Sequence, residues 1–352
     1  MPIATPTAFQ NALLRWFDAH GRKDLPWQIN KTPYRVWVSE IMLQQTQVST
    51  ATPYYLRFMK AFPTLKSLAN ATEDEVLHLW TGLGYYSRAR NLHKAAQKIQ
   101  TEFKGHFPDT LEGIVSLPGI GQSTAGAILS IAFKKQATIL DGNVKRVLAR
   151  YLGITEPINQ TTVEQSMWEA AIRYTPKKRV DDYTQAIMDL GATHCTRSKP
   201  QCTTCPLQKT CEGHALGIAE TLPRKTSAKA IPTKTATFLV IEHQGHILLE
   251  KRKAKGIWGG LYALPQLEGE LTAAAVKAHC KANYQTSVKA CEKLEPFRHT
   301  FSHYHLVLCP YRLTLPAKAK LLDKPGQLWY NLEQPKSIGL PKPILSILRS
   351  LT

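Results

Sequence analysis

The chain has 352 residues, and its 45 Lys and Arg residues exceed its 26 Asp and Glu residues by a net charge of +19. This length accommodates two domains with separate cores, and the basic balance predicts an anionic partner, nucleic acid before membrane surface. No apolar run approaches the roughly 18 residues of a spanning helix, and the opening MPIATPTAFQ resembles no secretory signal. We therefore expect a cytoplasmic protein that does not bind membranes.

The N-terminal part has helical periodicity from Thr7 to about Cys195. Apolar residues recur at helical spacing in TAFQNALLRWFDAH, EDEVLHLWTG, RNLHKAAQKIQTEF and TVEQSMWEAAIRY, whereas strand-like alternation is nearly absent. Pro and Gly residues divide the region into about ten short helices. The pattern predicts an all-helical domain over residues 1–220.

The composition changes after this region. Residues 221–236, TLPRKTSAKAIPTKTA, contain four basic and no acidic residues with two prolines, which is typical of an exposed linker. Beyond it, TFLVIEH, HILLEKRK and HYHLVLCPYRL read as strands, and TAAAVKAHCKANY and PILSILRSL as helices. We predict an α+β domain over residues 237–352.

A glycine-rich turn is expected within LPGIGQSTAGAI, residues 117–128. Gly119 and Gly121 permit tight turns or close approach by another molecule, and the small residues after them read as a helix. Backbone N–H groups at such a helix start form an anion site. The alternative is a helix-helix turn that packs well and binds nothing.

Four of the seven cysteines cluster with C-x6-C-x2-C-x5-C spacing, namely Cys195, Cys202, Cys205 and Cys211. In a chain without an export signal, such clustering indicates metal rather than disulfides. The spacing is compatible with tetrahedral zinc and with an iron–sulfur cluster, and does not decide between them. The other three, Cys280, Cys291 and Cys309, are expected as small buried side chains.

Two carboxylates have surroundings that permit catalysis. Glu40 lies in VWVSEIML, apolar on nearly every side, so it is either exposed on the one polar stripe or desolvated with a raised pKa. Asp141 opens DGNVKRVL, where an aspartate is either a helix cap or a catalytic group. A pair of carboxylates with separated pKa values suits glycosidic-bond cleavage.

Further stretches have a structural and a functional interpretation. Gln44 and Gln45 in MLQQTQ interrupt an apolar helix, either as a solvated helix end or as contacts to a ligand. Tyr85 or Tyr86 in GLGYYSRAR is a core aromatic or an exposed one. FRHTFSHYHL is either an ordinary alternating strand or a binding segment.

These motifs together resemble the helix-hairpin-helix DNA glycosylases of the endonuclease III superfamily, through GIG before a helix, LDGNVKRV and the cysteine spacing. LPWQINKTPYRVWVSEIMLQQTQV, LHLWTGLGYYSRARNLHKAA, WGGLYALPQ and FRHTFSHYHL resemble its adenine-excising (MutY) branch. The similarity spans nearly the whole chain. It implies a helix-hairpin-helix at about residues 110–130, a [4Fe–4S] cluster held in the loop at residues 195–211, and a C-terminal Nudix-like domain that recognises 8-oxoguanine.

The resemblance also implies the activity and its residues. The activity is monofunctional excision of adenine paired with 8-oxoguanine or G in double-stranded DNA, by a monomer, in base excision repair. Glu40 is then the general acid and base, Asp141 supports the cationic sugar, and Asn143 orients Asp141 or the sugar. The implied DNA contacts are Gln44, Gln45, Tyr85, Gly119, Gly121, Ser123, Phe301, Ser302 and His303, with Tyr85 wedged into the stack.

Two other functions account for part of the sequence, one an enzyme of a different reaction type and one a protein without catalysis. A bifunctional glycosylase/lyase requires a nucleophilic lysine at the start of the helix after the hairpin, where this chain has Ser123. A non-catalytic, metal-stapled DNA-binding protein explains the charge and the cysteines, but leaves Glu40 and the second domain without purpose. A Nudix hydrolase is disfavoured because TAAAVKAHCKANY has no carboxylate to hold Mg²⁺.

Overall fold

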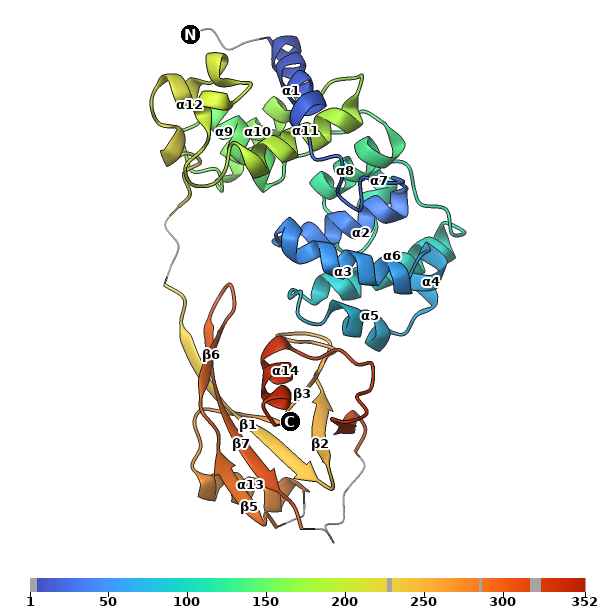
Figure 1. Cartoon of the computed structure of the whole chain (residues 1–352), viewed down its shortest axis with the longest axis vertical. Helices are drawn as coiled ribbons and strands as arrows, with labels where there is room; N and C mark the ends of the chain where they lie inside the picture. Colours follow the sequence, from blue (N-terminus) through green and yellow to red (C-terminus); the bar gives the residue numbers. More distant parts are fainter. Residues whose placement is uncertain (1–4, 227–229, 285–286, 317–323, 352) are drawn as a thin grey trace. The chain divides into compact units, whose positions relative to one another are not determined.

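The computed structural model describes residues 5–226, 230–284, 287–316 and 324–351. The chain divides into two compact units (Figure 1): Met1–Asn70 with Asn91–Ala228, and Ala71–Arg90 with Lys229–Thr352. Within the described ranges, no helix is long and apolar enough to span a membrane.

The first unit is all-helical, and its helix starts follow local capping rules. Thr5, Thr32 and Thr110 each accept a hydrogen bond from a backbone N–H of the first turn, a contact that stabilises a helix by about 1 kcal/mol. Its α-helices are α1 (Pro6–His20), α2 (Pro33–Leu43), α3 (Val48–Ala61), α4 (Leu65–Asn70), α6 (Ser87–Glu102), α7 (Leu111–Val115), α8 (Gln122–Phe133), α9 (Gly142–Tyr151), α10 (Thr161–Tyr174), α11 (Val180–Thr193) and α12 (Glu212–Ala215).

Small residues on α8 allow the chain to pack closely around it. The side chains of α8 are buried from Ala125 to Ile131, and the helix packs against α2, α7 and α11. A Cβ atom at Gly126 would overlap the carbonyl oxygen of Thr138. The extended segment that leads to Asp141 therefore lies directly on α8.

The cysteine-bearing loop follows α11 and packs beside α9 (Figure 1). It contains the short 3-10 turns η1 (Cys202–Thr204) and η2 (Gln208–Thr210) before α12, and η3 (Ala219–Thr221) after it. Gly213 of α12 lies so close to α9 that a Cβ would be 2.6 Å from the carbonyl oxygen of Arg150. The loop is thus fitted against the backbone of α9.

The second unit contains α5 (Glu73–Trp80), which starts with a capping box between Thr72 and Glu75, and a mixed eight-stranded sheet. The strands are β1 (Thr233–His243), β2 (His246–Lys251), β3 (Tyr262–Ala263), β4 (Gln266–Glu268), β5 (Ala290–Lys293), β6 (Phe297–Thr300), β7 (His305–Thr314) and β8 (Gln327–Asn331). Their central order is β3-β2-β1-β7-β5, with β4 on β1, β6 on β7 and β8 on β2.

The register of the sheet sets its two faces. β1 and β7 pair in parallel from Thr233 opposite His305 to Glu242 opposite Thr314, and the other pairs are antiparallel. Alternate residues of one face, including Leu239 and Leu313, form a buried core with Val276 and Cys280 of α13 (Ala273–Tyr284). On β7, Pro310 borders a groove with Ile347 of α14 (Lys342–Arg349).

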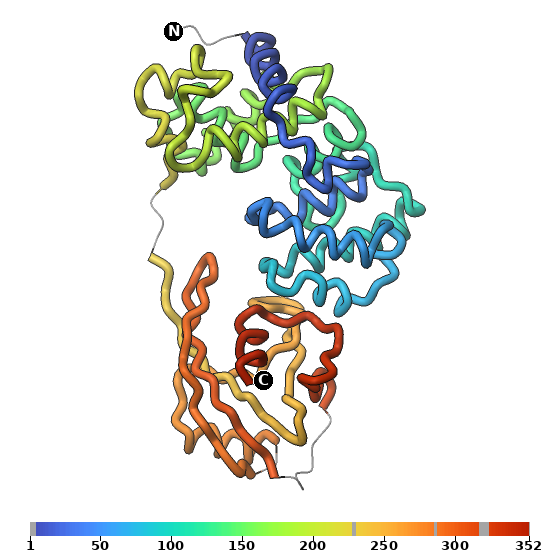
Figure 2. The backbone as a smooth tube through the Cα atoms, in the orientation of Figure 1, coloured from blue at the N-terminus to red at the C-terminus, as the bar shows by residue number. Residues whose placement is uncertain are grey.

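Two segments differ from the simplest interpretations of the sequence. β1 begins at Thr233, inside the segment expected as a linker, while residues 227–229 of that segment lie outside the described residues. The stretch FRHTFSHYHL does not form one alternating strand, because β6 ends at Thr300 and the chain turns back into β7 at His305 (Figure 2). The turn at residues 301–304 is closed by a hydrogen bond from the Phe301 N–H to the Tyr304 carbonyl, 2.9 Å.

Candidate active site and cysteine-lined pocket

Glu40 lies near the C-terminal end of α2 as a half-buried residue among buried neighbours. Desolvation raises the pKa of Glu40 from 4.5 to about 8, and the negative charge of Asp141 adds to the rise. The described part of the chain offers its carboxyl no hydrogen bond that would favour the charged form. A pKa raised to about 8 favours the protonated form of Glu40 at neutral pH.

Asp141 is the N-cap of α9 and the second candidate carboxylate of the site. Its Oδ1 accepts hydrogen bonds from the backbone N–H groups of Asn143, 3.0 Å, and Val144, 2.8 Å, and its Oδ2 accepts one from Asn143 Nδ2, 3.2 Å. Desolvation raises the pKa of Asp141, and these hydrogen bonds oppose the rise. Of these two carboxyls, Asp141 is the one that accepts hydrogen bonds favouring its charged form, although burial leaves its pKa raised overall.

Ser123 connects the hairpin helix to this carboxylate. Its hydroxyl, in the first turn of α8, accepts a hydrogen bond from the backbone N–H of Leu140 at 3.0 Å. The preceding hairpin turn has two different glycines. Gly119 has φ +79 and its missing Cβ would lie 2.7 Å from Asn91 Cβ, whereas Gly121, the N-cap of α8, faces open space.

The other expected contacts of this unit lie at the end of α2. Gln44 is the C-cap residue of α2, and its Nε2 lies 3.4 Å from Thr124 Oγ1 of α8. Gln45 follows as an exposed residue with φ 55. The polar residues of MLQQTQ therefore mark the C-terminal end of α2, where Gln44 approaches the first turn of α8.

Arg146, which sequence reasoning missed, connects the carboxylate to the cysteine loop. Its Nη2 donates to Asn143 Oδ1, 2.7 Å, and its Nε donates to the Cys195 carbonyl, 2.6 Å. Gly191 of α11 permits this arrangement, since a Cβ there would lie 2.7 Å from Asn143 Cβ. The only signal in the sequence was the pair of arginines four residues apart in VKRVLAR, on one face of a helix.

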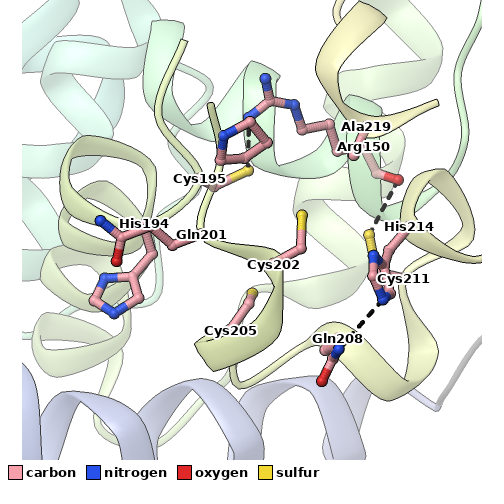
Figure 3. A pocket seen from close by; sticks show the side chains of 11 residues that line it. Arg150, His194, Cys195, Gln201, Cys202, Cys205, Gln208, Cys211, His214 and Ala219 are labelled. Carbon is pink, nitrogen blue, oxygen red and sulfur yellow. Dashed lines mark hydrogen bonds between the residues drawn. The ribbon is translucent and has the colours of Figure 1, made fainter. Parts of the chain in front are cut away.

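The four predicted cysteines line one pocket (Figure 3), shared with Arg150, His194 and His214. Buried Arg150 donates from Nη1 to Cys195 Sγ, 3.3 Å, and to the Thr196 carbonyl, 2.7 Å. Burial raises the pKa of Cys205 to about 12, and also raises the pKa values of Cys202 and Cys211. Across the described ranges, no three His, Cys, Asp or Glu side chains are grouped as ligands of a single metal ion.

The remaining predicted residues belong to the second unit. Tyr85 is 45% exposed at φ 49, with the Arg88 guanidinium 5.4 Å from its ring centroid, whereas Tyr86 is buried. In the 301–304 turn, Ser302 and His303 are exposed and Ser302 Oγ lies 3.4 Å from His303 Nδ1. The exposed aromatic of the GLGYY segment is thus Tyr85.

Comparison with known proteins identifies the family. Residues 38–172 match the HhH-GPD superfamily base excision DNA repair protein model, and residues 236–350 match the NUDIX domain model. The chain is 42% identical to an adenine DNA glycosylase of Buchnera aphidicola subsp. Acyrthosiphon pisum, over 98% of each chain. The chain belongs to the adenine DNA glycosylase family.

Other matches agree with this membership. An adenine DNA glycosylase of Mus musculus is 35% identical, over 94% of this chain and 75% of its own length. A solved thermostable thymine-DNA glycosylase is 26% identical with a TM-score of 0.55, over 60% of this chain and 97% of its own. The predicted fold class, a helix-hairpin-helix domain with a C-terminal Nudix-like α+β domain, is confirmed, as are the enzyme class, a DNA N-glycosylase, and DNA as partner.

Proposed function

We propose that this DNA N-glycosylase removes adenine paired with 8-oxoguanine, and with G, by hydrolysing the N-glycosidic bond without cutting the strand. The observation that carries the proposal is the electrostatic interaction of two desolvated carboxyls, in which the charge of Asp141 raises the pKa of Glu40 further. Desolvation raises the pKa of Glu40 to about 8, which favours its protonated form at neutral pH, and Asp141 accepts three hydrogen bonds that favour its charged form. Acid and anion are the two groups that departure of a base from deoxyribose requires.

Glu40 supplies the proton. Adenine is a poor leaving group as an anion, so protonation of its ring by Glu40 allows the C–N bond to break with both bonding electrons passing to the base. The target base is first flipped out of the stack. After the bond breaks, the Glu40 carboxylate accepts a proton from the attacking water.

Asp141 stabilises the positive charge that develops on the sugar. The carboxylate is held by the start of α9 and by Asn143, so its orientation is set before DNA binds. Water adds to the sugar carbon and leaves an abasic site. Arg146 secures Asn143 from the other side, so its role is positioning.

The hairpin turn supplies a phosphate contact. The open space in front of Gly121 and the uncapped N–H groups of α8 support a backbone grip on one DNA phosphate. Ser123 belongs to the same turn of helix. Exposed Gln45 is proposed to enter the duplex near the base opposite adenine, and exposed Tyr85 to wedge the stack.

The 301–304 turn is proposed to recognise 8-oxoguanine. Its exposed Ser302 hydroxyl both donates and accepts hydrogen bonds, and His303 extends the polar tip. Phe301 supplies an aromatic face beside them. We further propose that the enzyme acts as a monomer in the cytoplasm, in contact with the nucleoid.

The cysteine pocket is proposed to hold a [4Fe–4S] cluster through Cys195, Cys202, Cys205 and Cys211. Four cysteine thiols lining one pocket match the four thiolate ligands that a [4Fe–4S] cluster takes. When bound, the cluster would cross-link the four cysteines of the loop and stabilise it, and would take no part in the hydrolysis. Arg150, which donates to Cys195 Sγ, compensates the charge of the thiolates.

The two rival functions lack support from the site. The lyase requires a lysine amine where Ser123 contributes a hydroxyl that is engaged with Leu140. A non-catalytic binding protein has no need for a desolvated acid beside an oriented carboxylate, because that arrangement only costs stability.

A duplex with one 8-oxoguanine:A pair tests the proposal. The enzyme should release free adenine, and the adenine strand should break after alkali but hardly before it. An undamaged A:T duplex is the matched control. Breakage without alkali would indicate the lyase, and absence of adenine release under single-turnover conditions would refute the proposal.

A further inference from the structure

Trp258 adopts a backbone conformation that is unusual for its size. It lies between β2 and β3 with φ 57, in the left-handed region that bulky L residues rarely adopt. The tight loop imposes this conformation: a Cβ at Gly259 would overlap the Ala254 carbonyl oxygen, and Gly260 has φ +78. Such a conformation persists only where surrounding contacts hold it, and it often serves a function.

The strained backbone directs the indole to the 301–304 turn. Trp258 is 7% exposed, and its ring centroid lies 5.6 Å from Phe301 and 6.3 Å from His299. The Arg252 guanidinium covers the indole at 5.8 Å and is itself fixed by a hydrogen bond from Nη1 to Gln266 Oε1, 2.8 Å. The indole of Trp258 is therefore packed against Arg252 and also against Phe301 of the 301–304 turn.

Within the turn, Phe301 separates the support from the exposed tip. Its ring contacts His299 edge-on at 4.7 Å and Tyr304 at 4.9 Å, and its N–H closes the turn. The next two residues, Ser302 and His303, are exposed and belong to the turn that connects β6 to β7. Fixing Phe301 therefore fixes the direction in which Ser302 is presented.

We propose that Trp258 is a positioning residue for damaged-base recognition, which acts by holding Phe301 so that Ser302 is preorganised toward 8-oxoguanine. This inference rests on the proposed function of the turn. Trp258 does not touch the base in this account. A preorganised turn avoids the entropic cost of ordering Ser302 on binding, so its loss weakens discrimination rather than the chemical step.

The test compares Trp258→Leu with Trp329→Leu, a second tryptophan of the same unit that packs on the core around Leu239. Single-turnover adenine release is measured on 8-oxoguanine:A and G:A duplexes. Trp258→Leu should lower the preference for 8-oxoguanine:A by about tenfold and leave the G:A rate within about twofold. Trp258→Phe should restore part of the preference, and Trp329→Leu should retain it.

A double-mutant cycle and amide hydrogen exchange distinguish the positioning role of Trp258 from the recognition of 8-oxoguanine by the turn. Trp258→Leu should cause no further loss in a Ser302→Ala background, and should speed amide exchange at residues 301–304. Equal losses in both backgrounds, or unchanged exchange, would overturn the role of Trp258. If Ser302→Ala retains the wild-type preference, the proposed recognition by the turn is wrong, while the exchange result still decides whether Trp258 holds the turn.

Discussion

Ser123 accepts a hydrogen bond at 3.0 Å from the backbone N–H of Leu140, the residue immediately before Asp141. The first turn of α8 therefore fixes the backbone of the residue that precedes Asp141. The same turn of helix presents the uncapped N–H groups proposed to hold a phosphate. In the proposed function, seating of the DNA backbone and orientation of Asp141 thus depend on the same short segment.

Removal of this hydroxyl should affect chemistry more than binding. Ser123→Ala leaves the Leu140 N–H without its partner and loosens Asp141, so we expect single-turnover adenine release to slow by about tenfold, the equivalent of about 1.4 kcal/mol. The dissociation constant for DNA should change by less than about threefold, since the backbone N–H groups remain. Ser130→Ala, which removes a buried hydroxyl bonded within α8, is the control. An equal effect from both variants would contradict a specific role for Ser123.

The pH–rate profile should be bell-shaped, with limbs set by the two carboxyls. The pKa of Glu40 is raised to about 8, so the required proton is present below that pH and the rate falls as pH rises through about 8. The pKa of Asp141 is also raised, so the acid limb should lie above 3.8, the ordinary value for aspartate. Single-turnover rates from pH 4 to 9.5 measure both limbs, and a rate that stays constant above pH 8 would rule out Glu40 as the acid.

Asn143 should control the acid limb. Asn143→Ala removes the hydrogen bond to Asp141 Oδ2 and the link to Arg146, so the charged form of Asp141 loses stabilisation and its pKa rises further. We expect a lower rate and an acid limb displaced to higher pH, with the alkaline limb near 8 retained. Asn159→Ala, which breaks a surface contact to Thr226, should leave the profile unchanged. Equal displacement in both variants would contradict the assignment.

Metal analysis tests the cysteine pocket. Protein purified without oxygen should contain about four iron atoms and four acid-labile sulfides per chain, as four cysteine ligands of a [4Fe–4S] cluster require. Cys202→Ala should lose iron and melt at a lower temperature, because the loop loses its staple. Cys280→Ala, buried in the core of the second unit, should retain the iron. Stoichiometric zinc in place of iron would contradict the cluster.

The sequence predicted the parts of the fold that depend on local patterns. Helical spacing in TAFQNALLRWFDAH and TVEQSMWEAAIRY corresponds to α1 and α10, and the apolar run TFLVIEH lies within β1. These elements were predictable because burial of one helical face or one strand leaves a period in the sequence. The family, and with it the fold class, followed from motifs that combine chemistry with spacing.

Contacts between distant residues were not predictable in this way. The Ser123–Leu140 bond spans 17 residues, and Arg146 reaches Cys195 across 49, so no periodic signal reports them. FRHTFSHYHL divides into β6, a turn and the start of β7 because β6 pairs antiparallel with β7. The alternation of residues along the stretch does not report this pairing. Trp258 shows the same limit, since its left-handed backbone is imposed by its loop.

The most direct measurement is adenine release by Glu40→Gln on an 8-oxoguanine:A duplex under single-turnover conditions, with DNA affinity measured in parallel. The glutamine keeps the size of the side chain but has no proton to deliver at any accessible pH. Adenine release by Glu40→Gln should be abolished while affinity for the mismatch is largely retained. Glu169→Gln, a control at an exposed position of α10, should retain wild-type activity. Turnover by Glu40→Gln at the wild-type rate would contradict the central claim.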